Sequence, residues 1–153
     1  MSKLKGPPPP PRVIPAKRKF SVLFVCVGNC IRSQFAEAFA RAYGADVIEP
    51  SSCGVAPAGF IAEPVGRILK ERGIALGRQA SKSVYEAGPG PFDVVVNLTG
   101  MPLPRNFPRP QKDAVPRDWP VPDPMGAAEQ TYREAAQEIE NRVMRLVLEL
   151  RAS

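Results

Sequence analysis

The feature that most constrains the fold is a strand-like run that turns directly into a helical pattern. Phe20–Cys26 (FSVLFVC) is apolar and rich in valine and phenylalanine, which is typical of a buried strand. Gly28 and Asn29 follow, and these residue types readily take sharp or left-handed backbone conformations. Ser33–Tyr43 is alanine-rich with apolar residues at helical spacing, and Gly44 ends it. The sequence therefore predicts a strand, a tight loop and a helix in direct succession.

The rest of the chain alternates between the two kinds of pattern. Further strands are expected at Asp46–Ser52, at Phe92–Leu98 and, as a short or edge strand, within Lys112–Trp119. Further helices are expected at Glu63–Arg72, Ser81–Ala87 and Ala127–Arg151. This alternation predicts an α/β fold of three layers, with a four-stranded parallel sheet and helices on both faces. Ligands of such sheets bind beyond the carboxyl ends of the strands, and Cys26 stands at such an end.

The amino-terminal segment differs in composition from the remainder. Residues 1–19 contain five consecutive prolines, Pro7 to Pro11, so we expect a disordered, basic, proline-rich tail ahead of one domain at 20–153. Residues 1–20 carry six basic and no acidic side chains, which accounts for the whole net charge of +6. The domain itself is therefore balanced in charge, and no nucleic-acid partner is expected.

Several classes of protein are excluded by what the sequence lacks. No stretch approaches the roughly 20 apolar residues of a membrane span, and the amino terminus has no apolar signal region, so no membrane insertion is expected. Three cysteines fit reduced thiols in the cytoplasm better than a disulfide framework. The absence of histidine removes a histidine general base and histidine-containing zinc sites, so no metal or cofactor is expected. The sequence gives no indication of an oligomeric state.

The corner FVCVGNCIRSQ admits three interpretations, namely a structural turn, a redox or metal pair of cysteines, or an oxyanion site. A tight loop before a helix turns several N–H groups inward, and together with the helix start they form an anion cradle. Arg32 adds a permanently charged bidentate donor. The same positive field favours the thiolate form of Cys26, to which Ser33 is placed to donate. An anion site and a nucleophile thus fall in one corner.

The stretch SVLFVCVGNCIRSQFAEAF resembles the signature of the low-molecular-weight protein tyrosine phosphatase family, which includes related arsenate reductases. The usual form is a strand followed by C-x-G-N-x-C-R-S, and the resemblance runs from about Phe20 to the carboxyl terminus. It implies that Cys26 attacks phosphorus or arsenic and that Arg32 binds the oxygens of the anion. It also implies a phosphate-binding loop after the first strand. The residues assigned to oxyanion binding and loop support are Val27, Gly28, Asn29, Cys30, Ile31, Ser33 and Ser52.

The same resemblance implies a general acid on a late loop. The family uses the aspartate of an Asp-Pro pair to protonate the departing oxygen, and this chain has Asp123-Pro124 shortly before its last helix. In a chain without histidine, a carboxylate is a natural choice for this proton transfer. Asp123 is therefore the expected general acid.

The chain departs from the family pattern at its cysteines. Cys30 stands one place earlier than the usual second cysteine, so we expect a plain loop residue rather than a disulfide partner of Cys26. Val96–Gly100 contains no resolving cysteine, which rules out a three-cysteine relay along that route. Cys53 is expected to serve packing.

Other departures concern the substrate. Gln34 follows Ser33 as in the arsenate reductases, where the phosphatases usually have proline. Met125 and Gly126 stand where the phosphatases usually place aromatic residues. Gln79 stands near the place of a histidine that supports the loop asparagine in many members.

Three functions remain open from the sequence. The first is a phosphatase acting on phosphotyrosine of a protein or on small aryl phosphates. The second is an arsenate reductase-like enzyme that takes its electrons from an external thiol. The third is a non-catalytic oxyanion-binding protein on the same scaffold.

Overall fold

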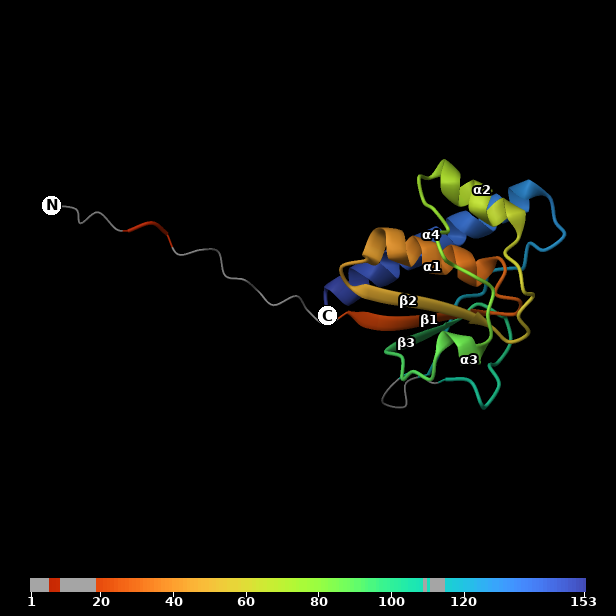
Figure 1. Cartoon of the computed structure of the whole chain (residues 1–153), viewed down its shortest axis with the longest axis horizontal. Helices are drawn as coiled ribbons and strands as arrows, with labels where there is room; N and C mark the ends of the chain where they lie inside the picture. Colours follow the sequence, from red (N-terminus) through yellow and green to blue (C-terminus); the bar gives the residue numbers. More distant parts are fainter. Residues whose placement is uncertain (1–5, 9–18, 109, 111–114) are drawn as a thin grey trace.

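The computed structural model describes residues 6–8, 19–108, 110 and 115–153 of the chain (Figure 1). The strands are β1 (Phe20–Cys26), β2 (Ile48–Gly54), β3 (Val94–Asn97) and β4 (Arg117–Asp118). The helices are α1 (Arg32–Gly44), α2 (Glu63–Glu71), α3 (Val84–Ala87) and α4 (Glu129–Arg151). The predicted tail, 1–19, lies mostly outside the described residues, and the domain boundary at residue 20 stays a prediction.

The strands form one parallel sheet in the order β2-β1-β3-β4, as predicted. β1 is central because its residues are apolar on both faces, and it pairs along its whole length with β2, from Phe20–Ile48 to Cys26–Gly54. All four strands point the same way, so the loops at their carboxyl ends meet at one edge. The loop after Cys26 lies at this edge.

Alternate residues of β1 enter two different cores. Val22, Phe24 and Cys26 face a large core beneath α1, α2 and α4, which lie together on one side of the sheet (Figure 1). Leu23 and Val25 face a smaller core on the other side. That side is covered by the single turn α3 and by loop residues that include Phe92, Leu103 and Phe107. The three layers are therefore present, but one outer layer is mostly loop.

The observed elements differ from the predicted ones mainly at their ends. β2 begins at Ile48 and continues to Gly54, because its pairing follows β1 to the last residue. β3 is shorter than predicted, since Phe92 makes only an isolated bridge to Pro110. The described part of the fourth strand is two residues long, and residues 111–114 of the predicted range lie outside the described residues. α4 begins at Glu129, two residues later than predicted.

Ion pairs attach both ends of α4 to neighbouring elements. Arg133 pairs with Glu71 at the end of α2, and Arg151 pairs with Asp46 between α1 and β2. Among the described residues, neither α4 nor any other helix has the length and apolarity that crossing a membrane requires.

Candidate active site

The loop between β1 and α1 exposes its carbonyl groups outward to neighbouring segments. The carbonyls of Cys26, Val27 and Gly28 accept hydrogen bonds from the amides of Val55, Ala56 and Ala58, at 2.9–3.1 Å. The Cys30 carbonyl accepts from the amide of Ala62, the Ile31 carbonyl from that of Phe35, and the Asn29 carbonyl from the side chain of Gln34. Since these carbonyls are bonded to neighbouring segments, the loop N–H groups are the polar backbone groups left for an anion. Among the described residues, the amides of Val27 to Ile31 donate to no other segment.

Two residues allow this tight path. Asn29 has φ of 49°, the left-handed region that asparagine tolerates better than most residues. Gly54 lies directly beneath the loop, and a Cβ there would come within 2.7 Å of the Val27 carbonyl oxygen and 2.9 Å of the Asn29 nitrogen. Only glycine lets the end of β2 lie this close to the loop backbone.

Arg32 is buried at the first turn of α1, and one nitrogen of its guanidinium is fixed by backbone carbonyls. Its Nη1 donates to the carbonyls of Leu98, at 2.7 Å, and Val121, at 3.1 Å. Its Nη2 lies 3.6 Å from Oδ2 of Asp123. The planar guanidinium has further donors on Nε and Nη2, and these are on the side that Nη1 does not use. Arg32 is thus oriented by the protein and retains donors for an anion.

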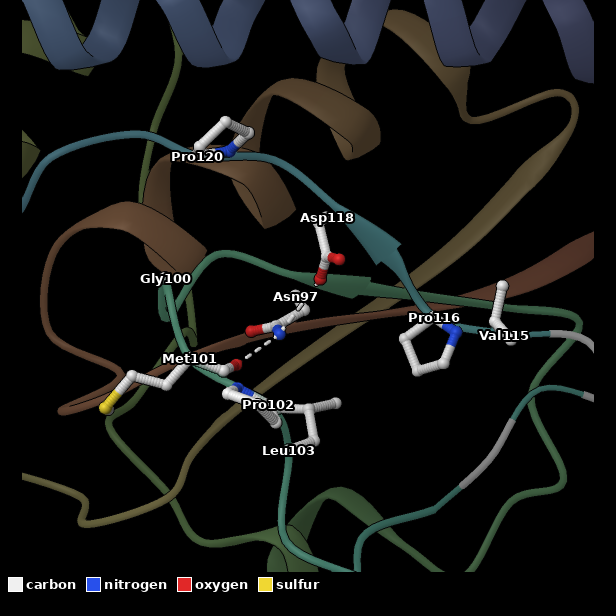
Figure 2. Close-up of a pocket in the computed structure, with 9 residues that line it drawn as sticks. All are labelled: Asn97, Gly100, Met101, Pro102, Leu103, Val115, Pro116, Asp118 and Pro120. Atoms are coloured by element: carbon white, nitrogen blue, oxygen red, sulfur yellow. Dashed lines mark hydrogen bonds between the residues drawn. The ribbon is translucent and has the colours of Figure 1, made fainter.

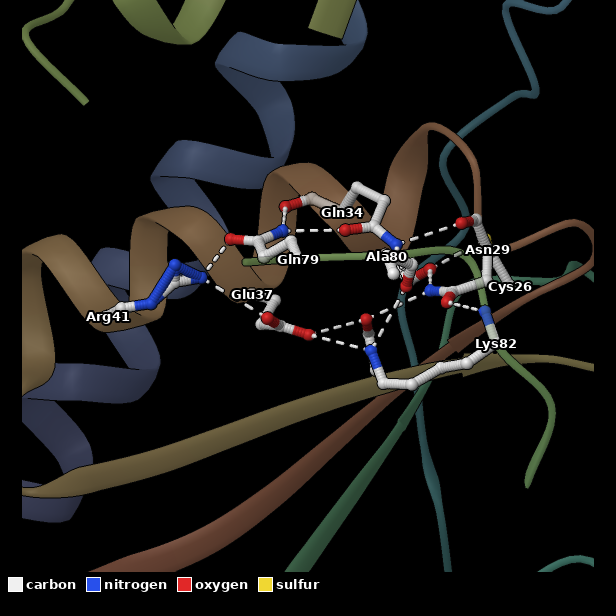
Figure 3. A network of polar contacts seen from close by, with 10 residues as sticks. Cys26, Asn29, Gln34, Glu37, Arg41, Gln79, Ala80 and Lys82 are labelled. Atoms are coloured by element: carbon white, nitrogen blue, oxygen red, sulfur yellow. Dashed lines mark hydrogen bonds and ion pairs between the residues drawn. The ribbon is translucent and has the colours of Figure 1, made fainter. Parts of the chain in front are cut away.

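A line of hydrogen bonds leads from a buried carboxylate to the Cys26 thiol (Figure 3). Ser52 Oγ donates to Glu37 Oε1 at 2.6 Å and accepts from Asn29 Nδ2 at 3.0 Å. Asn29 Nδ2 also donates to Ser33 Oγ at 2.7 Å, and Ser33 Oγ lies 2.8 Å from Cys26 Sγ.

This line has a direction. Because a carboxylate only accepts, Ser52 must donate to Glu37, and Asn29 then supplies hydrogens to both serines. The hydroxyl hydrogen of Ser33 is therefore available to the sulfur of Cys26. A serine donor stabilises a thiolate.

The side chain of Asn29 is fixed at both ends. Its Oδ1 accepts from the backbone amide of Lys82 at 2.8 Å, which defines the orientation of the amide group. Lys82 Nζ also lies 3.7 Å from Glu37, and Arg41 pairs with the same carboxylate at 3.2 Å. Two cations therefore lie beside this largely buried carboxylate.

Gln34 and Gln79 form the second support of the loop (Figure 3). Gln34 Nε2 donates to the carbonyls of Asn29, at 2.9 Å, and Ala80, at 3.0 Å. Gln79 Nε2 donates to Oε1 of Gln34 at 2.7 Å and to its backbone carbonyl, while Arg41 donates to Oε1 of Gln79. Gln79 thus acts on Asn29 through Gln34 and not directly.

Asp123 lies at the mouth of a cavity of about 410 Å³ in front of Arg32. Its Oδ1 accepts from the amide of Met125 at 3.0 Å, and its side chain is 48% exposed. The other walls of the cavity are Val27, Thr99, Gly100 and residues 120–122. The carboxyl group is therefore tethered but open to solvent and to the cavity.

The other two cysteines lie in different surroundings, and all three are free thiols. Cys30 is buried in the loop, where burial and then repulsion from Cys26 raise the pKa of its thiol. Cys53 belongs to the smaller core on the opposite face of the sheet from Cys26, and burial raises its pKa to about 12. These placements match the predicted packing role of Cys53. Within the described part of the chain, no group of three or more acidic or cysteine side chains is arranged to hold a metal ion.

Comparison with known proteins identifies the family. A model of the low molecular weight phosphotyrosine protein phosphatase family matches residues 21–153. This chain belongs to that family. The glutaredoxin arsenate reductase of Synechocystis is 30% identical over 131 residues, which cover 84% of this chain and 97% of that protein.

Solved structures of relatives agree with this assignment. An arsenate reductase in a phosphate-binding state has a TM-score of 0.76 at 30% identity, covering 87% of this chain and 99% of its own. The arginine phosphatase YwlE of Geobacillus stearothermophilus has a TM-score of 0.71 at 26% identity, covering 87% of this chain and 94% of its own. The relatives thus include both reductases and a phosphatase.

The structure brings together the residues that the sequence singled out. Cys26, Ser33, Asn29 and Ser52 are linked by hydrogen bonds, and Arg32 and Asp123 face each other at the cavity. Sequence reasoning did not identify other residues that hold the loop, among them Gly54, Lys82, Glu37 and the amides of Val55, Ala56, Ala58 and Ala62. Glu37 had a signal, since a carboxylate rarely stands on the apolar side of a helix without a partner.

Proposed function

We propose that this chain is a cysteine-dependent phosphatase that hydrolyses phosphate monoesters through a phosphocysteine. One observation carries the proposal. A thiol with a serine hydroxyl at 2.8 Å stands at the start of a short loop, and the arginine at the end of that loop lies 3.6 Å from an aspartate. A nucleophile, an oxyanion site and an acid are thus present in one place.

The proposed reaction has two steps. The Cys26 thiolate attacks phosphorus, the S–P bond forms as the bond to the leaving oxygen breaks, and Asp123 gives its proton to that oxygen. Asp123 then accepts a proton from a water that attacks phosphorus, which releases phosphate and returns the thiolate. Loop N–H groups and Arg32 stabilise the charge on the equatorial oxygens throughout, and Ser33 supports the thiolate as leaving group.

The proposed substrates are phosphotyrosine and small aryl phosphates. The cavity of about 410 Å³ is large enough for one such group and is lined by proline, valine and threonine. None of the described residues that line it is aromatic, so a phenyl ring would pack against aliphatic walls.

A second candidate is an arsenate reductase-like activity with an external thiol, and the relatives favour it. The Synechocystis relative is named an arsenate reductase, and Gln34, which the reductases share, holds the loop here. Reduction of arsenate to arsenite requires two electrons. Cys53 lies on the far face of the sheet, and Cys30 is not expected to pair with Cys26. Two external thiols would therefore supply those electrons and leave joined as one disulfide, which returns the Cys26 thiol.

A paired assay tests these functions. Wild-type protein is expected to hydrolyse p-nitrophenyl phosphate at mildly acidic pH, and Cys26→Ser is expected to abolish turnover while the fold remains. Consumption of arsenate with a thiol system, but no ester hydrolysis, would establish the reductase instead. Binding of phosphate with neither activity would leave the non-catalytic oxyanion-binding protein.

The three free cysteines support a reducing compartment such as the cytoplasm as the site of action.

A further inference from the structure

A second cavity lies beside the first, and the proposed reaction does not use it. It has a volume of about 550 Å³ and lies between the segment after β3 and the segment around β4 (Figure 2). Gly100 and Pro120 line both cavities. Arg32 is bonded to the carbonyls of Leu98 and Val121, which belong to the same two segments. The wall between the cavities is therefore attached to the arginine of the anion site.

The second cavity is held open by hydrogen bonds centred on Asn97, the last residue of β3. Asn97 Nδ2 donates to the Met101 carbonyl at 2.6 Å and to Asp118 Oδ1 at 3.1 Å. Its Oδ1 accepts from the amide of Thr99 at 2.9 Å and from the Thr99 hydroxyl at 2.6 Å. Since Asn97 joins both walls, the cavity exists before any ligand arrives.

The chemistry of the cavity is aliphatic with one negative charge. Its apolar wall consists of Met101, Pro102, Leu103, Val115, Pro116 and Pro120. Among the described residues, Asp118 is the only charged one of the lining, and of its two carboxylate oxygens only Oδ1 has a hydrogen-bond partner there. The neighbouring cation, Arg117, pairs with Glu149 on α4. The cavity thus suits an aliphatic arm that ends in a cation, as in lysine or arginine.

We propose that this cavity binds a lysine or arginine side chain that neighbours the phosphorylated residue of a peptide substrate. The proposal rests on the proposed phosphatase activity. Two adjoining cavities with shared wall residues are suited to two side chains from one peptide backbone, whereas a small ester fills only the first. Asp118 selects for a basic side chain, and the aliphatic wall covers the methylene groups of that lysine or arginine.

Trp119 provides a direct probe of binding. It is the only tryptophan of the chain, and it is buried between Asp118 and Pro120, two residues of the lining. Its fluorescence is measured while Cys26→Ser protein, which cannot turn over, is titrated with two phosphotyrosine pentapeptides. One peptide carries lysine on both sides of the phosphotyrosine, and the other carries glutamate.

The lysine peptide is expected to bind about three- to tenfold more tightly, the range of one partly exposed charge pair and its packing. Adding Asp118→Asn, which retains an acceptor for Asn97, is expected to bring the ratio of the two peptides' dissociation constants close to one. Val115→Lys is a second variant at an 81% exposed position of the wall, and it is expected to favour the glutamate peptide. Glu49→Gln, an exposed carboxylate early in β2, is the matched control and is expected to leave the ratio unchanged.

The outcomes separate the two proposals. Equal binding of both peptides, or a preference that survives Asp118→Asn and Val115→Lys, overturns the basic subsite. A loss of preference in Glu49→Gln would also overturn it, because the effect would then follow overall charge. Hydrolysis of p-nitrophenyl phosphate by the wild type is measured separately. If no hydrolysis is seen, the phosphatase proposal is wrong. The ratio of the two peptide affinities still tests whether the second cavity binds a basic side chain.

Discussion

Replacing Gly54 by alanine should damage the candidate site through the backbone of its loop. The new Cβ would lie 2.7 Å from the Val27 carbonyl oxygen, 2.9 Å from the Asn29 nitrogen and 3.0 Å from the Gly28 carbonyl carbon. Ordinary contact begins at 3.4 Å, so strand and loop must separate by up to 0.7 Å. All three atoms belong to the loop backbone, and none can move out of the way by a change of rotamer.

The expected effect on activity is larger than the effect on stability. Overpacking a tight site costs about 1–3 kcal/mol of the free energy of unfolding. A displacement of about 1 Å at a reacting group costs on the order of a hundredfold in rate. A shift of up to 0.7 Å at the loop should therefore lower kcat/KM for p-nitrophenyl phosphate by about ten- to a hundredfold.

Gly44→Ala is the matched control. A Cβ at Gly44 would also approach another atom to 2.7 Å, but that atom is a methyl group of Val147 in α4. A side chain can rotate, and this contact lies at the end of α1 away from the loop. We expect a modest loss of stability and unchanged kcat/KM, measured by urea unfolding and by ester hydrolysis. Full activity of Gly54→Ala, or an equal loss in Gly44→Ala, would refute the reasoning.

Three further predictions concern other parts of the chain. Asp123→Ala should lower turnover of p-nitrophenyl phosphate by about two to four orders of magnitude, the usual contribution of a general acid, and a rate near wild type would mean that another group supplies the proton. Deletion of residues 1–18 should leave the circular dichroism spectrum and activity unchanged, since β1 begins at Phe20, and loss of either would show that the segment supports the domain. Burial raises the pKa of Cys53 to about 12, above the usual value of about 8.5, so its stabilising contribution is complete below pH 8.5 and is lost as the pH rises toward 12. The free energy of unfolding should therefore fall more steeply over that range in the wild type than in Cys53→Ala, and parallel curves would contradict this.

The sequence predicted the parts of the fold that rest on local patterns. β1 and α1 were predictable because an apolar strand and an alanine-rich helix each bury a recognisable face. The ends of β2 and β3 depend on pairing with β1, which no local pattern records. The thin covering of the second face was also not predictable, because loop residues such as Phe92 and Phe107 take the place of a full helix there.

For the candidate site, the motif predicted which residues come together but not how they are held. Cys26, Asn29, Arg32 and Ser33 lie within eight residues, so their proximity follows from the loop itself. The partner of the arginine could be placed only through the Asp-Pro pair of Asp123. The direction of the hydrogen bonds toward Cys26 required coordinates, because it depends on the contact between Ser52 and Glu37 across two elements.

The anion-binding face of the loop is a property of its surroundings as much as of its own residues. The loop between β1 and α1 has as many carbonyl groups as N–H groups, and an inward carbonyl would repel an oxyanion. Here four amides between residues 55 and 62 donate to the carbonyls of Cys26, Val27, Gly28 and Cys30, and the side chain of Gln34 donates to that of Asn29. Gly54 lets this segment approach closely enough to do so. The chemistry of Cys26 therefore depends on a stretch that contains none of the proposed catalytic residues. For this reason a single methyl group added at Gly54 is expected to lower kcat/KM.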